Sequence, residues 1–154
     1  MSRAALFVVI QFVLLGTFAL LLLAFPVGGG AVAAGFIVVI AAFLLIALGI
    51  LEHMLRNAAI PNITPTPNQN VGLVDTGVYK YIRHPIYSGV IAGTFGAALA
   101  HGHIVPLLFA LVFVGFFSTK ARFEESMLRR IYPQYAEYMT RTGRFVPGIN
   151  LISE

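Results

Sequence analysis

The chain has 154 residues, of which 58% are hydrophobic and 10% are charged, and its mean hydropathy is +0.87. Soluble domains average about 45–50% apolar and about 25% charged residues, so lipid is the expected solvent. The absence of cysteine excludes disulfides, thiolate metal sites and cysteine nucleophiles. The formal net charge of +4 is modest and favours an effect of membrane topology over nucleic-acid binding.

Four apolar segments predict four transmembrane helices, at about 4–25, 31–51, 87–100 and 104–122. The turns PVGGG and HGH join the first span to the second and the third to the fourth, so each pair is predicted to form an antiparallel helical hairpin. Because AVA at 31–33 resembles a cleavage site, the first segment has the alternative of a signal peptide, although its apolar run is longer than the usual core of about 7–15 residues. The predicted fold class is an all-α polytopic membrane protein, one domain over residues 1–154.

The distribution of Lys and Arg predicts the orientation in the membrane. These residues occur at the N-terminus, within 56–83 and from 120 onward, and the two short turns contain none. By the positive-inside rule, both termini and the 52–86 loop are expected to be cytoplasmic, in the cell's inner membrane. A C-terminal interfacial helix is predicted for about 123–142, with its tyrosines against lipid.

Small residues repeat along two of the predicted spans. The second span has one every seven residues and the third has one every four, at Gly35, Ala42, Gly49, Gly89, Gly93 and Ala97. This pattern indicates close helix packing in lipid. The alternative is that it leaves room for a ligand beside the third span.

Residues 57–76 cannot form a regular helix, because Pro61, Pro65 and Pro67 remove backbone donors and favour extended neighbours. A connection of this length tends to be functional or disordered. It is interpreted either as a lid over a cofactor or as a plain linker.

The motif YIRHPIY at 81–87 places Arg83 and His84 at the inner boundary of the membrane. One interpretation is a basic anchor whose neighbouring tyrosines form the aromatic belt. The other is a binding site, because Pro85 fits the first turn of a helix whose start can hold an anion.

Two adjacent glutamates, Glu124 and Glu125, follow the fourth apolar run. Helical spacing pairs Lys120 with Glu124 and Glu125 with Arg129, which is typical of a salt-bridged interfacial helix. Neighbouring side chains point about 100° apart, so at least one glutamate should face the bundle. An ionisable group that faces the interior at this depth is a candidate functional residue.

Together these motifs resemble the membrane methyltransferases that use S-adenosylmethionine: the isoprenylcysteine carboxyl methyltransferases and their bacterial phospholipid-methyltransferase-like relatives. The family pattern is Arg-His-Pro with a Tyr two residues on, then Glu-Glu, Tyr-x-x-Tyr and Arg-Phe-x-Pro. Over about residues 50–149 it falls on Arg83, His84, Pro85, Tyr87, Glu124, Glu125, Tyr135, Tyr138, Arg144, Phe145 and Pro147. The chain departs from the common pattern at Val78 and Lys80, where Pro and Arg are usual.

The resemblance implies a site for S-adenosylmethionine at the cytoplasmic face. Arg83, His84 and the helix start at Pro85 are predicted to bind its carboxylate, and Glu124 or Glu125 its ammonium. Tyr79, Tyr81 or Tyr87 would stack on the adenine or face the sulfonium. Further candidates for roles in the reaction are Glu125, Arg122 and Arg144, the two arginines as guides for an anionic substrate. No metal is expected.

The predicted acceptor is a lipid-like or lipidated molecule, such as a prenylcysteine carboxylate or an aminolipid, and an amine would need Glu or His as a base. Two other functions stay open. A membrane sterol or enone reductase that uses NADPH can carry a similar segment, typically with Asn where this chain has Ile86. A non-catalytic membrane protein would need polar groups within the spans, where this chain has chiefly Gln11, Thr17 and Thr94.

Overall fold

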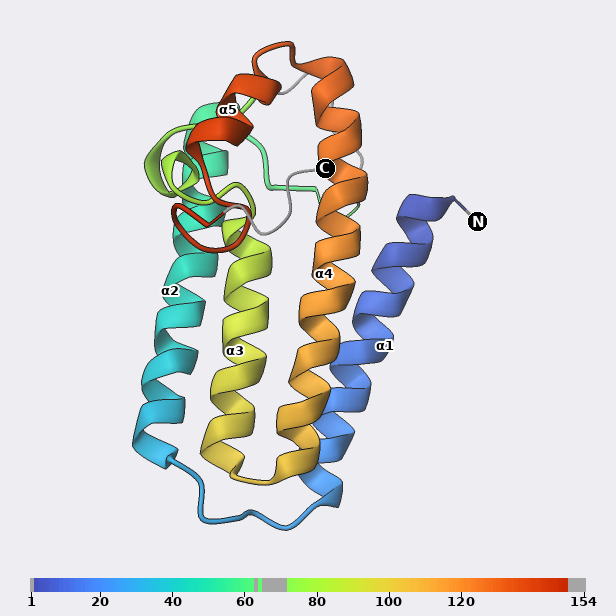
Figure 1. The fold of residues 1–154 in the computed structure, drawn as a ribbon, viewed down its shortest axis with the longest axis vertical. Helices are drawn as coiled ribbons and strands as arrows, with labels where there is room; N and C mark the ends of the chain where they lie inside the picture. Colours follow the sequence, from blue (N-terminus) through green and yellow to red (C-terminus); the bar gives the residue numbers. More distant parts are fainter. Residues whose placement is uncertain (1, 63, 65–71, 150–154) are drawn as a thin grey trace.

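Helices account for the regular structure of the described residues, which confirms the all-α prediction. The computed structural model describes residues 2–62, 64 and 72–149. In Figure 1, α3 lies between α2 and α4, and α1 lies beside α4. The bounds in chain order are α1 Arg3–Ala24, α2 Val32–Asn57, the 3-10 helix η1 Gly77–Lys80, α3 Pro85–His101, α4 Ile104–Ile131 and α5 Tyr135–Arg141.

Within the described ranges, three helices, α1, α2 and α4, are long and apolar enough to cross a membrane. The polytopic membrane class is therefore confirmed. Large apolar side chains of α1 and α2 point outward, among them Leu20, Leu23 and Phe43, as expected for contact with lipid. The span predicted at 87–100 lies within α3, which has 17 residues and is shorter than the other three helices.

The hairpin prediction holds for α3 and α4 but not for α1 and α2. Helix α1 packs mainly on α4, whereas α2 packs on α3. The residues between α1 and α2 lead the chain across the end of the bundle, where the N–H of Gly28 donates to the carbonyl of His101 at 2.8 Å. The pairing of α2 with α3 fits their side-chain sizes, because small residues of the two helices lie against each other.

The predicted C-terminal helix at about 123–142 is divided in the structure. Residues up to Ile131 continue α4, and a separate α5 begins at Tyr135. Pro133 explains the break, since it lacks an N–H and disfavours helical geometry in the residue before it. The turn brings α5 back over the end of the bundle that carries the start of α3 (Figure 1).

The close contact between α2 and α3 depends on glycine, as the small-residue pattern predicted. Gly35, Ala42 and Gly49 are buried on α2. A Cβ added at Gly89 would lie 2.9 Å from the carbonyl oxygen of Ala42 and would collide with Ile46. A Cβ added at Gly93, one turn later, would meet the Cβ of Ala42 at an ordinary 3.6 Å.

We therefore expect Gly89→Ala to lower the free energy of unfolding by about 1–3 kcal/mol, because the backbone of α2 must shift. Gly93→Ala is the matched control and should be neutral or slightly stabilising, since alanine favours helix. Denaturation in mild detergent, followed by circular dichroism, measures both variants. Equal stabilities of the two variants would contradict the packing described.

Candidate functional site

A short backbone ladder fixes the Arg-His-Pro segment against the segment that follows α5. The N–H of Arg83 donates to the carbonyl of Gly143 at 2.9 Å, and the N–H of His84 donates to the carbonyl of Arg144 at 3.1 Å. In return, the N–H of Gly143 donates to the carbonyl of Tyr81 at 3.1 Å. A side chain at Gly143 would collide with the carbonyl of Val146, so this close return requires glycine.

Glu125 is the centre of a buried ion-pair network. Its side chain is 0% exposed, and its Oε1 atom lies 2.9 Å from Nε of Arg83. Its Oε2 atom lies 2.8 Å from Nη2 of Arg144, and Nε2 of His84 is 3.2 Å from Oε1. Charge-assisted bonds of this kind compensate the cost of burying a carboxylate. The network joins α4 to the start of α3 and to the chain after α5.

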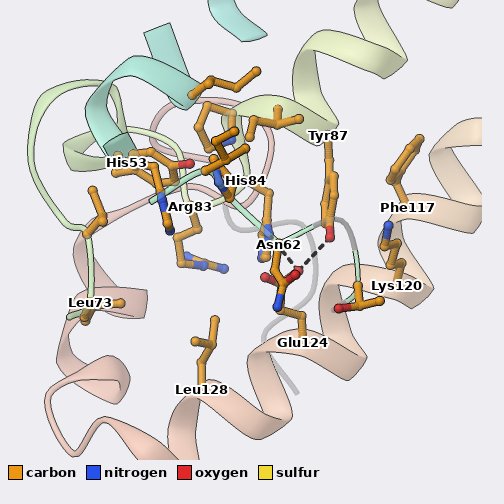
Figure 2. Close-up of a pocket in the computed structure, with 18 of the residues that line it drawn as sticks. His53, Asn62, Leu73, Arg83, His84, Tyr87, Phe117, Lys120, Glu124 and Leu128 are labelled. Carbon is orange, nitrogen blue, oxygen red and sulfur yellow. Dashed lines mark hydrogen bonds and ion pairs between the residues drawn. The ribbon is translucent and has the colours of Figure 1, made fainter. Parts of the chain in front are cut away.

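Glu124 has a different environment and lines a cavity. Its Oε2 atom accepts a hydrogen bond of 2.7 Å from the hydroxyl of Tyr87 and lies 3.8 Å from Nδ1 of His84. Figure 2 shows both interactions at the edge of the cavity, with the carboxylate between the two rings. Because a quarter of its side chain is exposed, Glu124 is accessible to a ligand.

The cavity has a volume of about 510 Å³ and lies where the end of α2 meets η1, α3, α4 and α5. Pockets for small molecules and cofactors span about 300–1,000 Å³. Residues 59–62, 64 and 72–74 of the long connection also line it. The choice between a lid and a plain linker for 57–76 falls in part on residues 63 and 65–71, which lie outside the described residues. Aromatic rings form much of the wall, from Tyr79, Tyr87, Phe117, Tyr132, Tyr135 and Tyr138.

Ring stacking orients the aromatic wall. The rings of His84 and Tyr87 are parallel within 3° at 5.2 Å, and Tyr87 contacts Phe117 at 4.9 Å between centroids. Burial, with the charges of Glu124 and Glu52, raises the pKa of the Tyr79 phenol above its ordinary value. The hydroxyl of Tyr135 is buried and has no hydrogen-bond partner among the described residues.

The structure brings most of the predicted site residues together. The cavity lining includes Tyr79, Arg83, His84, Pro85, Tyr87 and Glu124. Glu125 and Arg144 lie in the adjacent ion-pair network, outside the lining. Tyr81 and Arg122 are exposed and do not line the cavity.

Two polar residues of the cavity, Gln11 and Lys120, are among those that the sequence analysis did not assign to the site. The spacing of Lys120 and Glu124 placed both on one face of a helix, which was a usable signal. The pairing of Lys120 with Gln11, which lies 109 residues away, had no signal in the sequence.

This geometry defines the class of the protein: a membrane protein with a charged, aromatic cavity at one end of its helices. Residues 23–135 match the family model described as phospholipid methyltransferase. The chain therefore belongs to the phospholipid methyltransferase family of membrane methyltransferases, which includes enzymes dependent on S-adenosylmethionine.

Curated relatives match about half of the chain. The cobalt-zinc-cadmium resistance protein CzcN of Cupriavidus metallidurans is 33% identical over 84 residues, 54% of this chain and 39% of that protein. Protein-S-isoprenylcysteine O-methyltransferase B of Arabidopsis thaliana is 36% identical over 80 residues, 51% of this chain and 41% of that protein. The Schizosaccharomyces pombe protein-S-isoprenylcysteine O-methyltransferase is 34% identical over 84 residues, 53% of this chain and 36% of that protein. The chain thus spans well under half the length of these relatives.

We expect Glu125→Gln to destabilise the fold by about 3–5 kcal/mol, because it leaves the two buried guanidinium groups without their carboxylate. Glu124→Gln makes the same chemical change one residue earlier and should cost about 1 kcal/mol or less, since only the contacts with Tyr87 and His84 weaken. Denaturant titration in detergent compares them. Equal losses of stability in the two variants would show that the ion-pair network around Glu125 is not the main electrostatic contribution to the stability of the fold.

Proposed function

We propose that the cavity binds S-adenosylmethionine and that the chain transfers its methyl group to a lipid-like or small hydrophobic acceptor at the cytoplasmic face of the membrane. The observation that carries this proposal is the accessible carboxylate of Glu124, held by Tyr87 and His84 inside an aromatic cavity. Membership of a methyltransferase family supports the choice of cofactor.

The residues of the cavity fit the chemical groups of this cofactor. Glu124 supplies a carboxylate for the ammonium, and the aromatic rings supply faces for the adenine and the sulfonium. The hydroxyl of Tyr135, buried and without a partner among the described residues, is a donor available to a polar ligand. Arg83 and His84 also line the cavity, and their N–H groups are assigned to the cofactor's carboxylate.

The geometry changes the role expected for Glu125. Three buried side chains already surround its oxygens, so we assign the ammonium to Glu124 and give Glu125 a positioning role. Through Arg83 and His84 it holds the Arg-His-Pro segment against α4. Arg144 completes this support from the C-terminal side and does not itself line the cavity.

When bound, S-adenosylmethionine supplies a methyl group on a cationic sulfur, and its transfer to a lone pair of the acceptor breaks the carbon–sulfur bond and leaves the electron pair on sulfur. The chain's own residues hold the reactants and exclude water, which strengthens electrostatic interactions in the cavity. If the acceptor is an amine, we assign the acceptance of its proton to His84, which also lines the cavity, because Glu124 is assigned to the cofactor's ammonium.

We further propose that α3 is the fourth membrane span. We also propose that the protein lies in the cell's inner membrane and that its cavity faces the cytoplasm. Exposed arginines Arg122, Arg129 and Arg130 lie on the end of α4 near the cavity. The two turns at the opposite end contain no Lys or Arg. This asymmetry of positive charge supports a cytoplasmic location for both termini.

We expect calorimetry on the full chain in detergent to show binding of S-adenosylmethionine, and Glu124→Gln to weaken it about tenfold or more, because a charge-assisted bond to the ammonium is lost. Glu137→Gln is the matched control, since Glu137 is an exposed glutamate of α5 outside the cavity. It should leave the affinity unchanged.

The same calorimeter separates the rival functions. Binding of NADPH without S-adenosylmethionine would favour a reductase and overturn this proposal. Binding of neither would favour a non-catalytic membrane protein. A methylation assay on a membrane lipid extract with labelled cofactor then identifies the acceptor.

A further inference from the structure

Lys120 gives the cavity a second charged end. It lies on α4 one turn before Glu124, is only 1% exposed and lines the cavity. Its Nζ atom donates a hydrogen bond of 2.6 Å to Oε1 of Gln11 on α1. A lysine so deeply enclosed is uncommon, and in a membrane protein such a residue is a functional candidate.

Aromatic faces surround the ammonium of Lys120 on the cavity side. Its Nζ atom is 4.9 Å from the ring centroid of Tyr87 and 5.9 Å from that of Phe117. The hydroxyl of the same Tyr87 donates to Glu124, so one tyrosine contacts both the carboxylate and the ammonium. Figure 2 shows Lys120 and Phe117 on one side of Tyr87 and Glu124 below it.

We propose that Lys120, positioned by Gln11, is the acceptor-recognition residue and that it selects a lipophilic acceptor with an anionic group. This inference rests on the proposed function. The cofactor's ammonium and sulfonium are both cationic, so attraction favours Glu124 for them and repulsion disfavours Lys120. Its carboxylate is assigned to Arg83, His84 and the start of α3, which line the same cavity. An anionic acceptor gains a charge-assisted hydrogen bond from Lys120, whereas an ammonium acceptor is repelled by it.

The place of Gln11 indicates that the acceptor is lipophilic. Gln11 is one of the few polar residues of α1, and its neighbours Phe12 and Val13 are exposed. The cation therefore lies where the cavity meets a helix whose outer surface is apolar. An acceptor held at Lys120 can keep its apolar chain among lipid-facing side chains while its anionic group reaches the cavity.

The test uses three ligands with the same sixteen-carbon chain: palmitate, hexadecylamine and hexadecanol. Binding of tritiated palmitate to the full chain in phosphatidylcholine nanodiscs is measured by scintillation proximity, with the other two as competitors. We expect saturable palmitate binding, with hexadecylamine and hexadecanol at least about tenfold weaker. Equal competition by hexadecylamine, or no saturable binding of palmitate, would overturn the inference without any variant.

Variants then assign the preference to a residue. Lys120→Met should weaken palmitate binding about tenfold or more, and Lys120→Arg should keep it within about threefold because the charge remains. Arg130→Met is the matched control: it removes the same charge from an exposed position of α4 outside the cavity and should have no effect. Gln11→Leu should give a smaller loss than Lys120→Met. Unchanged palmitate affinity in Lys120→Met would refute the assignment.

Calorimetry with S-adenosylmethionine on the same preparations keeps the two proposals distinguishable. We expect Lys120→Met to bind the cofactor within about threefold of the parent chain. An equal loss of cofactor and palmitate affinity would mean that Lys120 binds the cofactor instead. Absence of cofactor binding in the parent chain would refute the proposed function, whereas intact cofactor binding without palmitate selectivity would refute this inference alone.

Discussion

The arrangement of the site depends on burying one carboxylate, that of Glu125, among Arg83, His84 and Arg144. Its attraction to these groups draws together the start of α3, the end of α4 and the chain after α5. Because a lone buried charge is very unfavourable, the three segments gain stability only when they meet. The backbone ladder beside the network then sets their register, and the cavity forms next to this fixed point.

Helix geometry gives the adjacent residues Glu124 and Glu125 different roles. Side chains one residue apart on α4 point about 100° apart, so Glu125 turns into the ion-pair network while Glu124 turns toward the cavity. His84 faces both carboxylates through its two ring nitrogens and so couples the support to the site. The charged cavity in turn sits at the end of a bundle whose outer surface is apolar, a combination that suits a polar cofactor and a lipid-soluble acceptor.

The resemblance carried by the Arg-His-Pro and Glu-Glu motifs predicted the family, and charge clustering predicted that distant segments would converge. The fold class, the long helices and the packing role of Gly89 were also predictable, because hydropathy and small-residue spacing are local properties. The pairing of α1 with α4 was not predictable, and the proposed acceptor residue was first read as an ordinary partner of Glu124. Contacts such as that of Lys120 with Gln11 join elements far apart in the chain, and local patterns do not encode them.

The sequence by itself determined that this is an all-α membrane protein with methyltransferase motifs gathered at one end of its helices. Periodicity, hydropathy and proline placement act over a few residues, so their consequences can be followed along the chain. Only the tertiary structure decided which glutamate is buried support and which lines the cavity, that Tyr81 and Arg122 are exposed outside the cavity, and that α1 reaches it through Gln11. Those outcomes depend on the rotation of each helix about its axis and on the choice of its neighbours, which packing of the whole bundle sets.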